Sequence, residues 1–189
     1  MGAMVPSLWL ARHGETAWTI SRQHTGRTDL PLTAEGERQA REELAPKLAG
    51  ERFDLVLASP LRRARDTARL AGFDARLDER LREFDYGDYE AKTTAEILQE
   101  RPGWDLWTDG APGGERAEDV GARMDELIAD RLPGVERVLL FGHGHALRIL
   151  AARWLGLPAR EGRVLLLPPA GLGITGAEHG HPAIARWSI

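Results

Sequence analysis

The residues with the clearest chemical potential follow a short apolar run near the N-terminus. The run spans residues 8–11, and Arg12, His13 and Gly14 follow it directly. A short apolar run that ends abruptly in polar residues is typical of a buried strand whose carboxyl end opens into a site. A guanidinium beside an imidazole at such a point suits an oxyanion, phosphate above all.

A second histidine follows another predicted strand, far along the chain. A strand is predicted over 135–141, with the apolar run at 138–141, and Gly142, His143 and Gly144 follow it; a helix is predicted over 146–155. Free N–H groups at a helix N-terminus are suited to binding phosphate. This segment is therefore a candidate partner for His13.

A third segment supplies arginines. A strand is predicted over 53–58, and Ser59-Pro60 predicts the start of a helix, with Ser as the cap and Pro at the first helical position. Arg62 and Arg63 then fall in the first turn, where cations oppose the helix dipole. The segment alone favours a solvated, arginine-rich face; the functional alternative is that one arginine points back at a bound anion.

An acidic, aromatic segment over 81–90 is too irregular for a helix or a strand. Within it, Glu83 is followed by Phe84 and Tyr86. A carboxyl group among aromatic rings is a candidate general acid, because an apolar neighbourhood disfavours its charged form. The alternative is a solvent-exposed acidic loop.

These segments must be positioned by the remaining predicted elements. The predicted elements are a loop over 17–32, a helix from Thr33 with a kink or early end at Pro46, helices over 93–101 and 119–132, and closing strands over 163–167, 172–175 and 183–188. Alternating strands and helices imply an α/β layered domain. The strand carboxyl ends share one edge in such a sheet, so His13 and His143 converge there with Arg63 nearby.

Length, composition and charge narrow the function classes. The 189 residues predict a single domain, 1–189, with residues 1–6 as a flexible terminus. A net charge of −4 argues against a nucleic-acid partner, and the apolar runs are too short to span a membrane. The absence of cysteine excludes disulfides and thiolate metal sites. A cytoplasmic location and a monomer or homodimer are expected.

Six motifs together resemble the histidine phosphatase superfamily, in the branch that includes cofactor-dependent phosphoglycerate mutase. They are Arg12-His13-Gly14-Glu15-Thr16, Thr25-Gly26 leading to Asp29-Leu30-Pro31-Leu32-Thr33, Ser59-Pro60-Leu61-Arg62-Arg63-Ala64 with Thr67-Ala68, residues 83–87, Gly113-Gly114-Glu115, and His143-Gly144. They follow the family's order over nearly the whole chain. The resemblance implies a three-layer α/β/α sandwich with a mostly parallel central sheet.

The resemblance also implies roles for individual residues. His13 would be the nucleophile that forms a phosphohistidine. Glu83 would protonate the leaving oxygen and then act as the base for water. Candidate contacts to a small-molecule phosphomonoester are Thr19, His24, Thr25, Gly26, Tyr86 and Gly144, with Trp104 and Trp107 as further candidates on the leaving-group side.

Arg12, Arg63 and His143 would bind the phosphoryl oxygens. The family's arginine is the fifth residue of its Ser-Pro-Leu-x-Arg pattern, which selects Arg63 over Arg62. Phosphoryl transfer needs in-line attack and neutralisation of spread negative charge. Two arginines and a second histidine can supply that charge without a metal or another cofactor.

The chain departs from the family pattern at two positions. Thr19 stands where the family often has Asn, and Arg116 stands where Ser often follows Gly-Gly-Glu. Thr19 or a neighbour would have to replace the missing amide. Neither change removes a core catalytic group.

The cations that mutases of this family use to hold phosphoglycerate are missing at their expected positions. Phe84 follows the acid in place of Arg, Thr94 aligns with a Lys, and Thr108-Asp109 replaces an Arg pair. A neutral, partly aromatic cap favours release of the alcohol and entry of water. The sequence therefore predicts a phosphatase of sugar or other metabolite phosphates, with a phosphoglycerate mutase as the alternative.

Two further function classes remain open. A metal hydrolase could use His143-x-His145 or His179-x-His181, although no carboxylate lies at a familiar ligand spacing. His145 is expected near the pocket at the helix start, and His179 and His181 in an exposed turn. A catalytically weak phospholigand-binding module is compatible with this fold, but it would be expected to have lost His13 or Glu83.

Overall fold

The computed structural model describes residues 5–189, and its centre is a six-stranded sheet with the order β3-β2-β4-β1-β5-β6. The strands are β1 (Ser7–Arg12), β2 (Leu55–Ala58), β3 (Arg76–Leu77), β4 (Arg137–Gly142), β5 (Leu172–Glu178) and β6 (His181–Arg186). The first four in this order are parallel, β5 runs antiparallel to them, and β6, antiparallel to β5, runs in their direction again. The mostly parallel sheet is as predicted.

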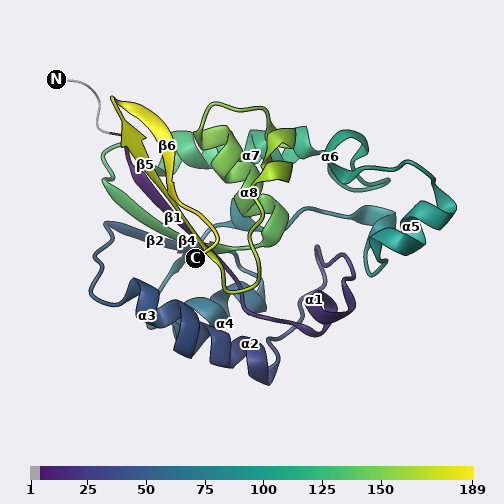
Figure 1. Ribbon diagram of the computed structural model, residues 1–189, viewed down its shortest axis with the longest axis horizontal. Helices are drawn as coiled ribbons and strands as arrows, with labels where there is room; N and C mark the ends of the chain where they lie inside the picture. Colours follow the sequence, from purple (N-terminus) through teal and green to yellow (C-terminus); the bar gives the residue numbers. More distant parts are fainter. Residues whose placement is uncertain (1–4) are drawn as a thin grey trace.

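Helices cover both faces of the sheet, which gives the predicted three layers (Figure 1). The α-helices are α1 (Ala17–Ser21), α2 (Ala34–Arg38), α3 (Ala45–Leu48), α4 (Arg62–Leu70), α5 (Thr94–Glu100), α6 (Leu106–Asp109), α7 (Ala117–Arg131) and α8 (Gly144–Trp154). Figure 1 shows α2, α3 and α4 on one face and α7 and α8 on the other. The segment with α5 and α6 extends beyond one end of the sheet.

Side-chain alternation along the strands explains why both faces are covered. In β1, Leu8 and Leu10 contribute to the core under α7 and α8, whereas Trp9 and Ala11 contribute to the core under the other helices. All four are buried. Continuous apolar runs of this kind are typical of parallel strands that are covered on both sides.

Strand register brings the two histidine segments together. Arg12 pairs with Gly142 across β1 and β4, so His13 and His143 leave neighbouring strands at the same edge. Ser59 follows β2, the other neighbour of β4, at this edge as well. The predicted convergence of the strand ends is confirmed.

The helices predicted over 93–101, 119–132 and 146–155 match the structure within three residues at each end, and so do the strands predicted over 172–175 and 183–188. One predicted strand does not match. The strand predicted over 163–167 is absent: residues 159–164 form a 3-10 helix, η4 (Ala159–Val164). The edge strands of the sheet are β3 and β6, and this segment pairs with neither of them. Val164 and Leu166 are exposed, in contrast to the residues of a central strand.

Two helix predictions need correction as well. Leu61, rather than Ser59, is the N-cap of α4, so Pro60 precedes the helix. The Pro46 region shows no sharp break, because a π-helical segment, η1 (Gln39–Leu44), joins α2 to α3. Its wider turn lets the N–H of Ala45 reach the carbonyl of Ala40 just before proline, which has no N–H to donate.

The remaining 3-10 helices are η2 (Glu79–Leu81) and η3 (Gly87–Tyr89). Of the terminus predicted as flexible, residues 1–4 lie outside the described part of the chain, and Pro6 is buried beside β1. Between residues 5 and 189, no helix combines the length and the apolar character needed to cross a bilayer.

Candidate active site

A cavity of about 260 Å³ opens at the carboxyl edge of the parallel strands. Its walls are formed by Arg12, His13, Trp18, Thr19, Arg22, Gln23, His24, Thr25, Glu83, Tyr86, Gly144, His145 and Arg148. A larger hollow of about 520 Å³ lies against β3, but its lining contains no histidine. The chemistry predicted from the sequence therefore belongs to the smaller cavity.

His13 is buried and held in a defined orientation. Its Nδ1 lies 2.7 Å from the carbonyl of Gly14, which can only accept, so Nδ1 carries the proton and Nε2 is left with a free lone pair. Burial, followed by the charges of Arg63 and Arg12, holds the pKa of His13 well below the usual value of 6.5. A neutral imidazole with a free Nε2 is a competent nucleophile.

The backbone around His13 is fixed by close packing against α2. A Cβ on Gly14 would lie 2.3 Å from the carbonyl oxygen of Gly36, so only glycine allows this approach. The N–H of Gly14 donates to Thr67 Oγ1 at 3.1 Å, and the N–H of Glu15 donates to Gln39 Oε1 at 2.9 Å. The loop after β1 is thereby tied to both α4 and the π-helical segment.

Arg12 lies in the cavity wall with unused hydrogen-bonding capacity. One terminal nitrogen donates to the carbonyl of Leu167 at 2.7 Å, whereas its buried Nε has no partner. Its guanidinium lies against Gly144, where a Cβ would be 3.2 Å from Arg12 Cζ. Desolvation lowers the pKa of Arg12. Guanidinium groups nevertheless stay protonated in proteins. An incoming oxyanion can satisfy this cation.

His143 lies behind His13 and outside the cavity wall. The two imidazole centroids are 5.2 Å apart. Arg63 Nε lies 3.1 Å from Nδ1 of His143, and Ser59 Oγ lies 2.7 Å from its Nε2. Burial, then the charge of Arg63, lowers the pKa of His143 well below 6.5, so the ring is neutral.

Arg63 is fully buried and organises the backbone of residues 25–28. Its terminal nitrogens donate to the carbonyls of Thr25, Gly26 and Thr28 at distances of 2.8–3.1 Å. The sequence alternative of a solvated arginine is wrong for Arg63 and right for Arg62, which is exposed and pairs with Asp66. Arg63 is absent from the cavity wall, where it was expected to bind phosphoryl oxygens, and it adds positive charge from its position beside His143.

Glu83 joins the cavity to the start of α8. Its Oε1 accepts from the N–H groups of Phe84 and Ala146, both at 2.9 Å, and its Oε2 accepts from the N–H of His145 at 3.1 Å. It is the one carboxylate in the wall of this cavity. Asp85 instead pairs with Arg27 on another surface hollow, at 2.6 Å.

Aromatic side chains form the side of the cavity away from β1. Tyr86 Oη lies 2.6 Å from His145 Nδ1, and the Tyr86 ring stacks on Phe84 at 5.4 Å. His24 lies 4.7 Å from the Tyr86 ring. Burial raises the pKa of Tyr86 and lowers the pKa values of His145 and His24, so all three groups are neutral.

The two tryptophans predicted on the leaving-group side do not reach the cavity wall. Trp104 is buried behind His24 and donates its indole N–H to the carbonyl of Gly110 at 2.8 Å. Trp107 packs against His145 at a centroid distance of 5.2 Å. Their role here is packing, so neither is a contact on the leaving-group side of the cavity.

The other residues predicted to contact the substrate either line the cavity or support its wall from behind. Thr19 and Thr25 line the cavity, but the Thr19 hydroxyl donates to the carbonyl of Thr16 at 2.8 Å within the cap of α1. Gly26 supports the wall from behind, with its N–H on the carboxylate of Glu90 at 2.9 Å. Arg116 is exposed at the start of α7 and is absent from the wall.

Sequence reasoning missed two arginines in the cavity wall. Arg22 caps the end of α1, a five-residue helix within a segment predicted as loop. Arg148 lies in α8 one turn beyond Gly144, in a position that looks like an ordinary cation on a helix surface. The predicted neutral cap is therefore wrong. The i, i+4 spacing from Gly144 was the signal that could have identified Arg148.

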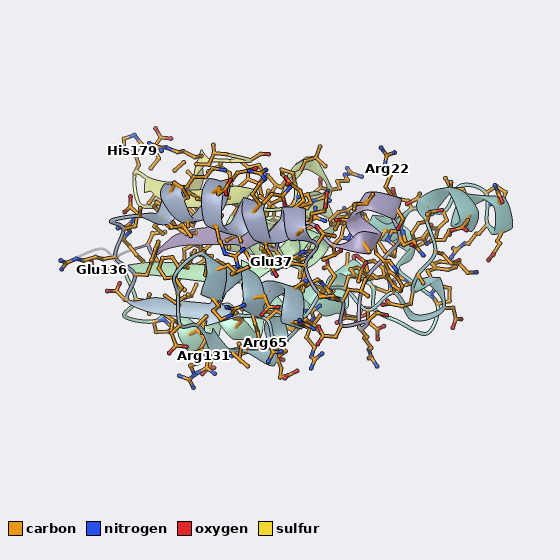
Figure 2. All side chains as sticks on the ribbon, turned by 90° about the horizontal axis from the view of Figure 1, so that it is seen from below. Arg22, Glu37, Arg65, Arg131, Glu136 and His179 are labelled. Atoms are coloured by element: carbon orange, nitrogen blue, oxygen red, sulfur yellow. The ribbon has the colours of Figure 1, made fainter. Side chains whose placement is uncertain are left out.

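The histidine pairs do not assemble a metal site. Between residues 5 and 189, no group of three or more His, Asp or Glu side chains is arranged to hold an ion. His179 and His181 lie in and beside the exposed turn of β5 and β6, and Figure 2 shows His179 toward the left end of the molecule, well separated from Arg22. His145 lies at the start of α8 beside the pocket, as expected.

Comparisons with known proteins agree with this geometry. The chain is 44% identical to an acid phosphatase of Mycobacterium tuberculosis, over 95% of this chain and 91% of that protein. It is 35% identical to sedoheptulose 1,7-bisphosphatase of Saccharomyces cerevisiae (85% and 72% covered) and 39% identical to a protein of Enterobacter named "Probable phosphoglycerate mutase" (85% and 80%).

Solved structures show the same fold over nearly the full length. A Mycobacterium tuberculosis protein superposes with a TM-score of 0.91 at 42% identity and 97% coverage of both chains. A mycobacterial glucosyl-3-phosphoglycerate phosphatase superposes with a TM-score of 0.82 at 31% identity, over 97% of this chain and 98% of that one. The sequence model of the histidine phosphatase superfamily (branch 1) matches residues 8–189. The chain belongs to this superfamily.

Proposed function

We propose that the chain is a metal-independent phosphatase of small-molecule phosphomonoesters that acts through a phosphohistidine at His13. The observation that carries this proposal is the orientation of His13. The bond from Nδ1 to the Gly14 carbonyl leaves Nε2 as the nucleophilic nitrogen, in the wall of a cavity that also contains Arg12 and Glu83. A neutral nucleophile, a cation and a carboxyl group thus meet in one small space.

In the first step, Nε2 of His13 attacks phosphorus while the bond from phosphorus to the ester oxygen breaks. The leaving oxygen receives a proton from Glu83, and the alcohol is released. Arg12 and Arg63 balance the charge on the phosphoryl oxygens, and their fixed positions require little rearrangement during transfer. Splitting the reaction through a covalent intermediate replaces one difficult step by two easier ones.

In the second step, water attacks the phosphohistidine. Glu83, now ionised, takes a proton from this water as the bond from phosphorus to Nε2 breaks. Inorganic phosphate leaves, and both His13 and Glu83 return to their starting protonation states. The N–H groups at the start of α8 hold the Glu83 carboxylate in place between the two steps.

Hydrolysis is favoured over phosphoglycerate isomerisation by the residues at the positions where mutases have cations. Phe84 is fully buried, and Asp109, in α6, lies 3.5 Å from Arg101. Thr94 contributes only a hydroxyl, 3.4 Å from His24 Nε2. Relatives named as phosphatases support the same reading, and the mutase-like relative keeps isomerisation as the second candidate.

A trapping experiment tests the proposal. Brief incubation with ³²P-labelled substrate in EDTA and an acid-free quench should give acid-labile label on the wild-type protein. The His13→Ala variant should carry no label and lose turnover. His179→Ala, a change in the exposed hairpin turn, is the matched control and should keep both.

The same preparation decides between the two candidate functions. With 3-phosphoglycerate and a trace of 2,3-bisphosphoglycerate, inorganic phosphate should appear and 2-phosphoglycerate should not accumulate. Rapid isomerisation would favour the mutase. Activity that EDTA abolishes and Zn²⁺ or Mg²⁺ restores, or labelling that persists in His13→Ala, would contradict the phosphohistidine mechanism.

A further inference from the structure

The cavity contains more positive charge than phosphoryl transfer needs. In the proposed mechanism, Glu83 is protonated while the substrate binds. The charge of Arg12 in the cavity wall and the charge of Arg63, which lies behind the wall beside His143, then match the two charges of the phosphoryl dianion. Arg22 and Arg148 are then left over in the same wall. Among residues 5–189, neither of them forms an ion pair with a carboxylate.

Arg148 is held rigidly in this unpaired state. Its Nε donates to the carbonyl of Gly162 at 3.0 Å, and one terminal nitrogen donates to the carbonyl of Arg163 at 2.8 Å. The guanidinium lies over the indole of Trp107, 4.6 Å from the ring centroid. These contacts fix the plane of the cation and leave the second terminal nitrogen free to bind a ligand.

The surroundings of Arg148 make its charge costly without an anion. Burial lowers its pKa, and the neighbouring charge of Arg12 acts in the same direction. Its attraction to Glu83 is lost when Glu83 carries a proton. A partly desolvated cation that is anchored beside another cation stabilises the complex most when the ligand itself is anionic.

Arg22 provides a second cation at the rim. It is exposed, and its backbone lies in the left-handed region, with φ of 62°, at the end of α1. Figure 2 shows its side chain beyond α1, directed away from the ribbon. A rim arginine of this kind can fold over a bound anion, whereas Arg148 is already positioned.

We propose that Arg148, assisted by Arg22, binds a second anionic group on the alcohol part of the substrate. The preferred substrates are then phosphomonoesters whose leaving alcohol carries a carboxylate or a second phosphate. This inference rests on the proposed function, because it assumes that His13 and Glu83 act on the other end of the same molecule. Arg148 is assigned here as a specificity-determining residue and not as a catalytic one.

A matched series of three-carbon esters tests the inference. n-Propyl phosphate is uncharged at the far end, 3-(phosphonooxy)propanoate carries a carboxylate, and propane-1,3-diol bisphosphate carries a second phosphate. When phosphate release is measured, the kcat/KM of the wild-type protein should be at least about tenfold higher on the two charged esters than on n-propyl phosphate, mainly because KM is lower. The preference should fall as salt is raised.

Variants identify the residues responsible. Arg148→Gln should reduce the preference for charged members by roughly tenfold or more, with a smaller loss on n-propyl phosphate. Arg148→Lys should restore part of it, and Arg22→Gln, at an exposed position, should reduce it less. Arg65→Gln is the control: Arg65 is exposed on α4, on the opposite face from Arg22 in Figure 2.

The outcomes separate the two proposals. Hydrolysis of all three esters without a preference would overturn this inference and leave the phosphatase intact. The same holds for a preference that survives in Arg148→Gln and in Arg22→Gln. No hydrolysis of any ester would overturn the proposed function and this inference with it. A preference for only one charged member would identify that group as the one recognised.

Discussion

Arg63 Nε donates a hydrogen bond to Nδ1 of His143 at 3.1 Å, and this bond sets the tautomer of the imidazole. A guanidinium can only donate, so Nδ1 must accept and the ring proton must lie on Nε2, 2.7 Å from Ser59 Oγ. Arg63 therefore does two things: it adds charge behind His13, and it holds His143 neutral in one tautomer.

The first prediction concerns this tautomer. In ¹⁵N spectra of the wild-type protein, Nδ1 of His143 should be unprotonated and should remain so below pH 6.5, because burial and Arg63 lower its pKa. Arg63→Lys removes the Nε–H and leaves the carbonyls of Thr25, Gly26 and Thr28 with fewer donors. Mixed tautomers and a loss of about 2 kcal/mol in unfolding free energy are expected.

Arg62→Lys is the control for this change. Arg62 is the adjacent residue, but it is exposed and pairs only with Asp66, so its replacement should alter neither the spectrum nor the stability measurably. A protonated Nδ1 in the wild-type protein would contradict the assigned tautomer.

The second prediction concerns the pH dependence of the nucleophile. Burial, Arg63 and Arg12 all lower the pKa of His13, so the neutral, reactive form persists below pH 6.5. The acid limb of kcat/KM for p-nitrophenyl phosphate should therefore lie well below 6.5, after allowance for the titration of the substrate. Arg12→Gln removes one of the charges that lower this pKa and should move the limb to higher pH.

The assignment of this limb can be checked with a second ester. A limb that belongs to His13 stays in place when the substrate is changed to one with a different phosphate pKa. A limb that follows the substrate, or that moves to lower pH in Arg12→Gln, would show that another group controls it.

The strand-end motifs were the part of the site most readable from sequence. In both 8–13 and 138–143, an uninterrupted run of four apolar residues is followed by one other residue and then a histidine. Parallel pairing of the neighbouring strands leaves little freedom in where the two side chains lie. The predicted strand over 163–167 is wrong because an apolar run alone does not show whether its backbone pairs with the sheet. Residues 159–164 formed η4 instead, with Val164 exposed.

The cavity wall beyond these motifs depends on tertiary contacts. Arg148 resembles a solvated helical cation until Trp107 and the carbonyls of Gly162 and Arg163 are seen to surround its guanidinium. The short helix α1 is stabilised by the reciprocal hydrogen bonds of Thr16 and Thr19 at its start, and its five residues are too few to show a periodic hydrophobic pattern. Such features follow from packing that a single sequence does not display.

The third prediction concerns stability. Asp78 is buried at the start of η2, where hydrogen bonds from Arg80, then from Arg131 on α7, lower its pKa to about 2. Compared with the usual value of 3.8, this corresponds to about 2 kcal/mol of stabilisation. Asp78→Asn should lose about that amount at neutral pH, as measured by urea unfolding.

The sign of its pH dependence is fixed by the direction of the shift. A carboxylate with a lowered pKa in the folded state stabilises fully above its unfolded value, near 4, and loses this effect as pH falls toward 2. The difference in unfolding free energy between the wild-type protein and Asp78→Asn should therefore decrease as the pH falls from about 4 toward 2. Asp130→Asn, an exposed partner of the same arginines, should cost less than about 1 kcal/mol. Equal losses in both variants would argue against a special role for Asp78.

The fourth prediction concerns Glu83 as the proton donor. Glu83→Gln keeps the shape of the side chain but removes the transferable proton, an effect of about 10²–10⁴-fold in typical enzymes. The loss in kcat should be large for n-propyl phosphate, because a leaving alkoxide needs a proton. It should be much smaller for p-nitrophenyl phosphate, whose phenolate leaves without one.

Glu83→Gln should also weaken hydrogen bonds at the start of α8, and the comparison of the two esters separates this effect from the loss of acid catalysis. The Glu83 carboxylate accepts N–H groups from both His145 and Ala146, and an amide offers one oxygen where the carboxylate offers two. Glu83→Gln should therefore also lose about 1 kcal/mol of stability, whatever the substrate. A positional effect lowers both rates alike, whereas loss of acid catalysis lowers only the alkyl ester. Equal losses on the two esters would show that Glu83 only positions α8 and the phosphoryl group. Solvent would then have to protonate the leaving oxygen, because Asp85 lies at another hollow and Asp88 is exposed.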